Sequence, residues 1–93
     1  MMTTDLSDAK RWVREGRLEE AVGWLTHYIE THCECDDEPY YLLGNAYRKQ
    51  GDWQQALNHY LEAIERNPQS PAVNARSMVM DILEFYNKDM YNQ

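Results

Sequence analysis

The sequence predicts an all-α protein made of paired helices, each of which needs a neighbour to cover its apolar stripe. Between Asp37 and Ser70, apolar and small residues recur at helical spacings of three and four on both sides of Gly51. An earlier stretch repeats this arrangement, because Gly16 lies 35 positions before Gly51 and Ala21 lies 35 positions before Ala56. A unit of this length cannot bury its apolar stripe alone, so the neighbouring unit must cover it.

The stretch 37–70 divides into two helices at Gly51, which suits the left-handed conformation that ends a helix. Gly44 removes a side chain where another helix can approach closely, at a helix-propensity cost of about 1 kcal/mol. Asp37 and Asp52 are placed to cap the two helices. The second helix carries an apolar stripe made of Trp53, Ala56, Leu57, Tyr60, Leu61 and Ile64.

These positions resemble a tetratricopeptide repeat, whose pattern W-x₂-L-G-x₂-Y, then A-x₃-F, then P extends over about 34 residues. Tyr40, Leu43, Gly44 and Tyr47 match its first part, and Ala56, Tyr60, Ala63 and Pro68 match the remainder. Tyr40 stands where the family usually has tryptophan and Tyr60 where it usually has phenylalanine, so both keep a large ring. The chain is similar to short stand-alone bacterial members. The resemblance implies a right-handed solenoid of about five helices, and protein–protein recognition as its default role.

The 93 residues are expected to form one domain with a degraded first repeat. After Pro68 the repeat pattern stops, and Ser70-Pro71 is a favourable start for a closing helix. We therefore predict a first repeat at about 4–36, a second at 37–70, a closing helix at about 71–87 and a frayed tail at 88–93.

The composition excludes several functional classes. Sixteen acidic against nine basic residues give a net charge of −7, which argues against nucleic acid and against anionic membrane surfaces as partners. No apolar run reaches the roughly 18 residues of a membrane span. The start has no basic segment followed by an apolar one, so we expect no signal peptide and a cytoplasmic location.

Catalytic and metal-binding motifs are also lacking. The chain has no glycine-rich phosphate loop, no G-x-S-x-G elbow and no H-E-x-x-H helix, so we expect neither catalytic residues nor a cofactor. Zinc sites usually need C-x₂₋₄-C spacing, and Cys33 and Cys35 are closer than that. His27 and His32 lie on different helical faces, so no metal site is predicted, and any role of the two cysteines stays open.

The candidate binding residues lie on the first helix of each pair, which lines the concave face if the resemblance holds. Tyr41, Asn45 and Arg48 recur at spacings of four and three beside the core stripe. Neighbouring helices are expected to add Lys10, Arg14 and Arg76. Some relatives clamp a terminal carboxylate with lysine, asparagine and arginine, but here only Asn45 matches that set, and Tyr41 and Arg76 replace two members. We therefore predict a peptide-binding groove for an acidic segment of another protein.

A structural role is the alternative function. The closing helix has an apolar arc that looks wider than one neighbouring repeat can cover. Such a helix can make the protein a homodimerising tether, with an interface predicted at Val79, Ile82, Leu83 and Tyr86. Otherwise the tail from Lys88 folds back and covers this arc.

Overall fold

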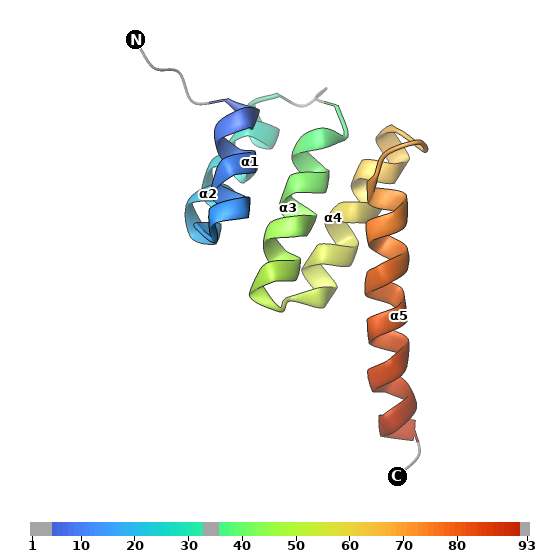
Figure 1. Ribbon diagram of the computed structural model, residues 1–93. Helices are drawn as coiled ribbons and strands as arrows, with labels where there is room; N and C mark the ends of the chain where they lie inside the picture. The colour runs from blue at the N-terminus through green and yellow to red at the C-terminus, as the bar shows by residue number, and fades with distance from the viewer. Residues whose placement is uncertain (1–4, 33–35, 92–93) are drawn as a thin grey trace.

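The computed structural model describes residues 5–32 and 36–91, with 85–91 described by their backbone alone. Consecutive helices run antiparallel, and α1, α3 and α5 form a layer in front of α2 and α4 (Figure 1). The described residues form α1 (Leu6–Glu15), α2 (Leu18–Thr31), α3 (Glu38–Gln50), α4 (Trp53–Arg66) and α5 (Ala72–Tyr91). This arrangement confirms the predicted all-α solenoid of helix hairpins.

The helix ends follow local sequence signals at most positions. Gly16 and Gly51 end α1 and α3 with φ values of 85° and 83°, a conformation that favours glycine. The Asp52 carboxylate accepts a hydrogen bond from the backbone N–H of Gln55 at 3.2 Å and caps α4 as predicted. Asp37 occupies the N-cap position of α3 as predicted, but its side chain makes no capping hydrogen bond within the described residues. Its backbone is already helical, and its carboxylate accepts instead from the side-chain amide of Asn67 at 3.4 Å.

α3 is the central helix of the molecule, and it contributes residues to two core clusters. On one side it packs against the first hairpin, and on the other side Tyr40 packs against α4 and α5. The first cluster comprises Ala9, Val13, Ala21, Leu25, Leu42, Leu43 and Ala46, and the second comprises Tyr40, Ala56, Tyr60, Ala63, Ala72 and Val79. Burial on both sides holds α3 in place, so the face of α3 that remains free has a fixed position.

The crossing of α3 and α4 is as close as the sequence predicts. A Cβ atom added at Gly44 would lie within 3.0 Å of three ring atoms of Tyr60. The Tyr60 side chain is wholly buried, so its ring has little room to move aside. Gly44 is therefore required by the approach of the two helices.

α5 differs from the prediction in its length. The helix begins after Ser70, whose hydroxyl oxygen accepts from the backbone N–H of Ala72 at 3.1 Å. It then continues to Tyr91, whereas we predict an end at about Asn87 and a frayed tail beyond it. The chain contains neither glycine nor proline after Pro71, so no residue stops the helix. None of the helices in the described ranges is long and apolar enough to cross a membrane.

Candidate functional site

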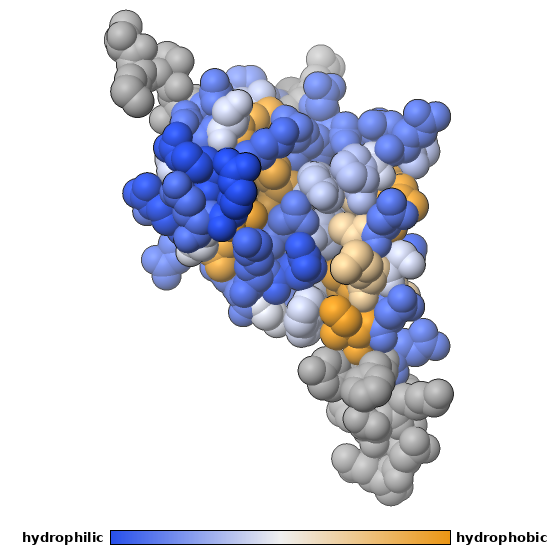
Figure 2. Space-filling view, viewed as in Figure 1, coloured by the Kyte–Doolittle hydropathy of each residue, from blue (hydrophilic) through white to orange (hydrophobic). Residues whose placement is uncertain are grey.

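Two hollows lie along the layer formed by α1, α3 and α5, and they share Tyr41, Asn45 and Arg48. The hollow between α1 and α3 has a volume of about 300 Å³ and is lined also by Lys10, Val13, Arg14, Leu42 and Lys49. The hollow between α3 and α5 has a volume of about 260 Å³ and is lined also by Pro71, Asn74, Ala75 and Met78. Figure 2 shows hydrophilic side chains over α1 and hydrophobic ones on α5 on this face of the molecule.

The structure brings most of the predicted binding residues together. Lys10, Arg14, Tyr41, Asn45 and Arg48 all line the hollow between α1 and α3. Arg76 does not line either hollow, and its Nε atom is buried without a hydrogen-bond partner among the described residues. The prediction that Arg76 joins the other binding residues is therefore wrong, and Asn74, Ala75 and Met78 line the hollow on the side of α5. Met78 is 57% exposed, so it offers an apolar contact.

The side chains of Asn45 and Arg48 both form hydrogen bonds with the hydroxyl group of Tyr60 in α4. The Tyr60 hydroxyl donates a hydrogen bond to the Asn45 Oδ1 atom at 2.5 Å and accepts one from the Arg48 Nε atom at 3.2 Å. Sequence reasoning missed this contact because it treated Tyr60 only as a ring in the apolar stripe. The sequence offered one signal for this contact. Tyr60 carries a hydroxyl group at a position where the family usually has phenylalanine, which has none.

The hollow between α1 and α3 is strongly basic. Lys10, Arg14, Arg48 and Lys49 line it, and no carboxylate belongs to its lining. At its rim the Lys10 Nζ atom lies 3.2 Å from the Glu38 carboxylate, and both side chains are exposed, so this pair is weak. The structure shows no ion pair for Arg14, Arg48 or Lys49 within the described part of the chain. Three cations that line this hollow therefore have no carboxylate partner among the described residues.

The buried phenol links stability to pH. Burial raises the pKa of Tyr60 above its ordinary value of 10.0, and the nearby Arg48 offsets part of this effect. The folded protein thus keeps this proton at a pH where the unfolded chain has lost it. The resulting stabilisation is complete below the unfolded pKa and is lost as the pH rises through the folded pKa.

We therefore expect the free energy of unfolding to fall as the pH rises above about 10. The Tyr60→Phe variant should lose less stability over the same interval, because it has no proton to release at this position. Urea unfolding at neutral and at alkaline pH gives the loss of stability in each protein. Subtracting one loss from the other cancels the contribution of the other tyrosines and the lysines, which both proteins share. Identical losses in the two proteins would contradict the expectation.

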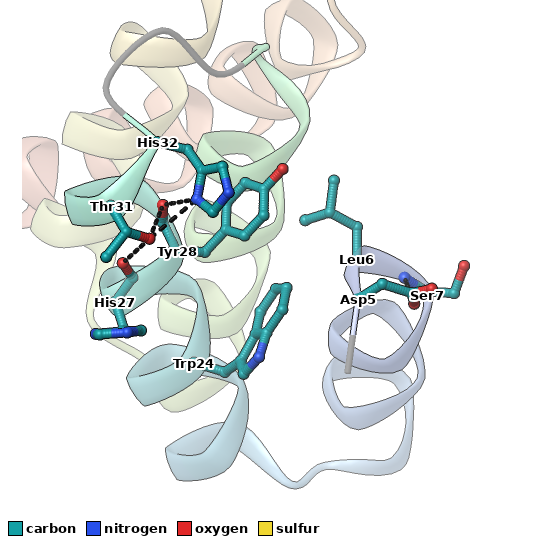
Figure 3. A pocket seen from close by; sticks show the side chains of 8 residues that line it. All are labelled: Asp5, Leu6, Ser7, Trp24, His27, Tyr28, Thr31 and His32. Carbon is teal, nitrogen blue, oxygen red and sulfur yellow. Dashed lines mark hydrogen bonds between the residues drawn. The ribbon is translucent and has the colours of Figure 1, made fainter. Parts of the chain in front are cut away.

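A further hollow of about 540 Å³ lies between the start of α1 and the end of α2, away from the two hollows beside α3. Trp24 stacks on Tyr28 with ring centroids 5.1 Å apart, and Tyr28 stacks on His32 at 4.1 Å. Figure 3 shows His27 pointing away from these rings. Because the two histidines do not converge, this hollow offers no arrangement for a metal ion, and Cys33 and Cys35 lie outside the described residues. The stacked rings line this hollow from the side of α2.

The predicted dimer interface on α5 is only partly available. Val79 is wholly buried in the second core cluster, so the prediction that it contacts a second copy is wrong. Leu83 packs against the same cluster, and Ile82 is half-buried. The side chain of Tyr86 lies outside the described residues. The inner stripe of α5 thus serves to close the chain's own core.

Comparisons with known proteins agree with the fold and the repeat pattern. The model of the tetratricopeptide repeat family matches residues 38–70. The structure is similar to the solution NMR structure of the Bacteroides fragilis protein BF1650, with a TM-score of 0.84 and 56% sequence identity over 98% of this chain and 92% of that chain. Comparison with curated proteins gives no significant match.

The chain belongs to the tetratricopeptide repeat proteins, and it is a short one, in which the matched repeat follows a more divergent hairpin. Such repeats are protein-interaction modules and not catalysts.

Proposed function

We propose that the chain binds an acidic segment of another protein in the groove of α1, α3 and α5. The observation that carries the proposal is the charge of the hollow between α1 and α3. This hollow has four basic side chains and no acidic one, although the whole chain has a net charge of −7. A basic surface on an acidic protein attracts acidic partners and repels basic ones, so it favours specificity.

Each groove residue has a chemically distinct role in this proposal. The terminal nitrogens of Arg48 can form two parallel hydrogen bonds to one carboxylate. The side-chain amide nitrogen of Asn45 can donate to a backbone carbonyl of the peptide. Tyr41 is half-buried between the two hollows and provides a ring surface, and Met78 adds an apolar contact on α5.

The two hollows also give the proposed ligand a direction. They lie on opposite sides of α3, with the basic side chains toward α1 and the apolar Met78 toward α5. A segment lying across α3 therefore places its acidic side chains toward α1 and an apolar side chain toward Met78. The preferred ligand is a peptide in which acidic and apolar residues lie close together.

Binding of a short fluorescein-labelled peptide of alternating glutamate and leucine, capped at both ends, tests the proposal by fluorescence anisotropy. Asn45→Ala and Lys10→Glu should each weaken binding by about 0.2–1 kcal/mol if the lost contact is exposed to solvent. Arg48→Glu should cost more, because it places a negative charge against the ligand's carboxylate. Lys10→Glu should have the smaller effect of the two reversals, since Lys10 already pairs with Glu38.

Two controls separate the groove from general charge effects. Arg17→Glu makes the same change in net charge at the exposed connection between α1 and α2, and it should leave the affinity unchanged. A peptide in which lysine replaces glutamate should not bind. Unchanged affinity for the acidic peptide in Asn45→Ala, Lys10→Glu and Arg48→Glu, with normal circular dichroism, would refute the proposed site.

A further inference from the structure

We propose that Tyr60 determines the ligand specificity of the groove, because its hydroxyl group orients the Asn45 amide with its donor nitrogen toward the ligand and holds the Arg48 guanidinium in place. Tyr60 acts from beneath the groove and does not itself touch the ligand, so it is a positioning residue. This inference rests on the proposed function and specifies it further. The groove should select carboxylates over neutral amides of the same shape.

One hydrogen bond of Tyr60 fixes which end of the Asn45 side-chain amide faces the ligand. An asparagine side chain has one acceptor oxygen and one donor nitrogen, and rotation about its last bond exchanges them. Here the Tyr60 hydroxyl donates to the Asn45 oxygen at 2.5 Å, so this acceptor points inward. The amide nitrogen is then left to face the ligand.

Arg48 is fixed by the same hydroxyl group. Its Nε atom donates to the Tyr60 oxygen at 3.2 Å, so this donor is directed into the protein. The two terminal nitrogens remain for a ligand, and they can bind a carboxylate in a forked geometry. A guanidinium held at one nitrogen loses less conformational freedom when the ligand arrives, so the hydroxyl group preorganises the site.

The first repeat serves as an internal comparison. At the positions 35 residues earlier, Leu25 replaces Tyr60, Lys10 replaces Asn45 and Val13 replaces Arg48. Leu25 is as fully buried as Tyr60, so a hairpin of this fold packs well without a hydroxyl group at this position. The hydroxyl group is present in the hairpin that also carries the asparagine and the arginine. This co-occurrence indicates a role at the groove surface and not in packing.

The test compares Tyr60→Phe with Tyr47→Phe, which removes a hydroxyl group from α3 where the ring stacks on His59 with centroids 5.2 Å apart. The first measurement needs no ligand. In ¹⁵N-labelled protein, the Arg48 Nε–H and the Asn45 side-chain amide resonances should shift, and the Nε–H should exchange faster with water, in Tyr60→Phe. Tyr47→Phe should leave both unchanged. Unchanged resonances in Tyr60→Phe would overturn the positioning role.

The second measurement is the ratio of affinities for the glutamate–leucine peptide and for the same peptide with glutamine in place of glutamate. In Tyr60→Phe the preference for glutamate should fall about 2- to 10-fold, the range expected for the loss of one hydrogen bond. Tyr47→Phe should keep the preference of the parent. An unchanged ratio in Tyr60→Phe would overturn the specificity role. Failure of the parent to bind either peptide would instead refute the proposed function, while the resonances still decide whether Tyr60 positions the two side chains.

Discussion

Gly44→Leu should lower the free energy of unfolding by about 1–3 kcal/mol or more, because it overpacks the crossing of α3 and α4. Even the single methyl group of Gly44→Ala should be destabilising. That Cβ atom would lie within 3.0 Å of three ring atoms of the wholly buried Tyr60. The resulting strain has to exceed the gain in helix propensity, which is about 1 kcal/mol for glycine to alanine.

Gly23 provides the matched control for this substitution. It lies inside α2 and is exposed, and a Cβ atom there would meet no other atom within 4 Å. Gly23→Ala should therefore stabilise the protein by up to about 1 kcal/mol through helix propensity alone. Urea unfolding compares the two variants directly. If Gly44→Ala proves as stable as Gly23→Ala, the close crossing of α3 and α4 is wrong.

The first repeat shows how the clash at Gly44 can be relieved. Ala9 and Leu25 occupy the positions 35 residues before Gly44 and Tyr60, and both are wholly buried in the first core cluster. The double variant Gly44→Ala/Tyr60→Leu recreates this pair in the second repeat. The double variant should lose less stability than the summed losses of the two single variants. A double-mutant cycle should give a coupling energy of about 0.5–3 kcal/mol.

Val79→Asp should have the second large effect, because it places a carboxylate in the core between α4 and α5. The substitution removes an apolar side chain whose full burial contributes roughly 1.5–3 kcal/mol. It also adds the cost of desolvating a charge, since Val79 has no exposed surface. For a domain with a total stability of about 5–15 kcal/mol, this change should detach α5 or unfold the protein.

Met78→Asp is the control for this variant, since the neighbouring Met78 is 57% exposed. Its stability should stay within about 0.5 kcal/mol of the parent. The comparison by urea unfolding also separates the two faces of α5, one packed on the core and one beside the groove. Equal midpoints for the two variants would show that α5 does not close the second core cluster.

The second repeat could be predicted closely because its signals are local. Glycine at a left-handed position ends α3, and a missing side chain marks the close crossing at Gly44. The extent of α5 could not be predicted in the same way, since no residue after Pro71 ends the helix. The predicted end at about Asn87 therefore had no glycine or proline to support it.

The residues that line the two hollows were predicted on α3 and in part missed on α5 for a geometric reason. One residue along a helix turns a side chain by about 100°, so Ala75 and Met78 line the hollow between α3 and α5 while Arg76 does not. Without the repeat pattern, nothing in the sequence fixed the rotation of α5 to within one residue. The contact of Tyr60 with Asn45 and Arg48 also depends on how deeply α4 packs against α3, which spacing alone does not reveal.

Chemical-shift mapping of the ¹⁵N-labelled protein with the capped glutamate–leucine peptide tests the central claim most directly. We expect the backbone amides that shift to lie along α3 around Tyr41, Asn45 and Arg48. They should continue on the first turns of α5 near Asn74 and Met78. Shifts gathered instead around Trp24, Tyr28 and His32, which line the hollow between α1 and α2, would contradict the assignment of the groove as the binding site.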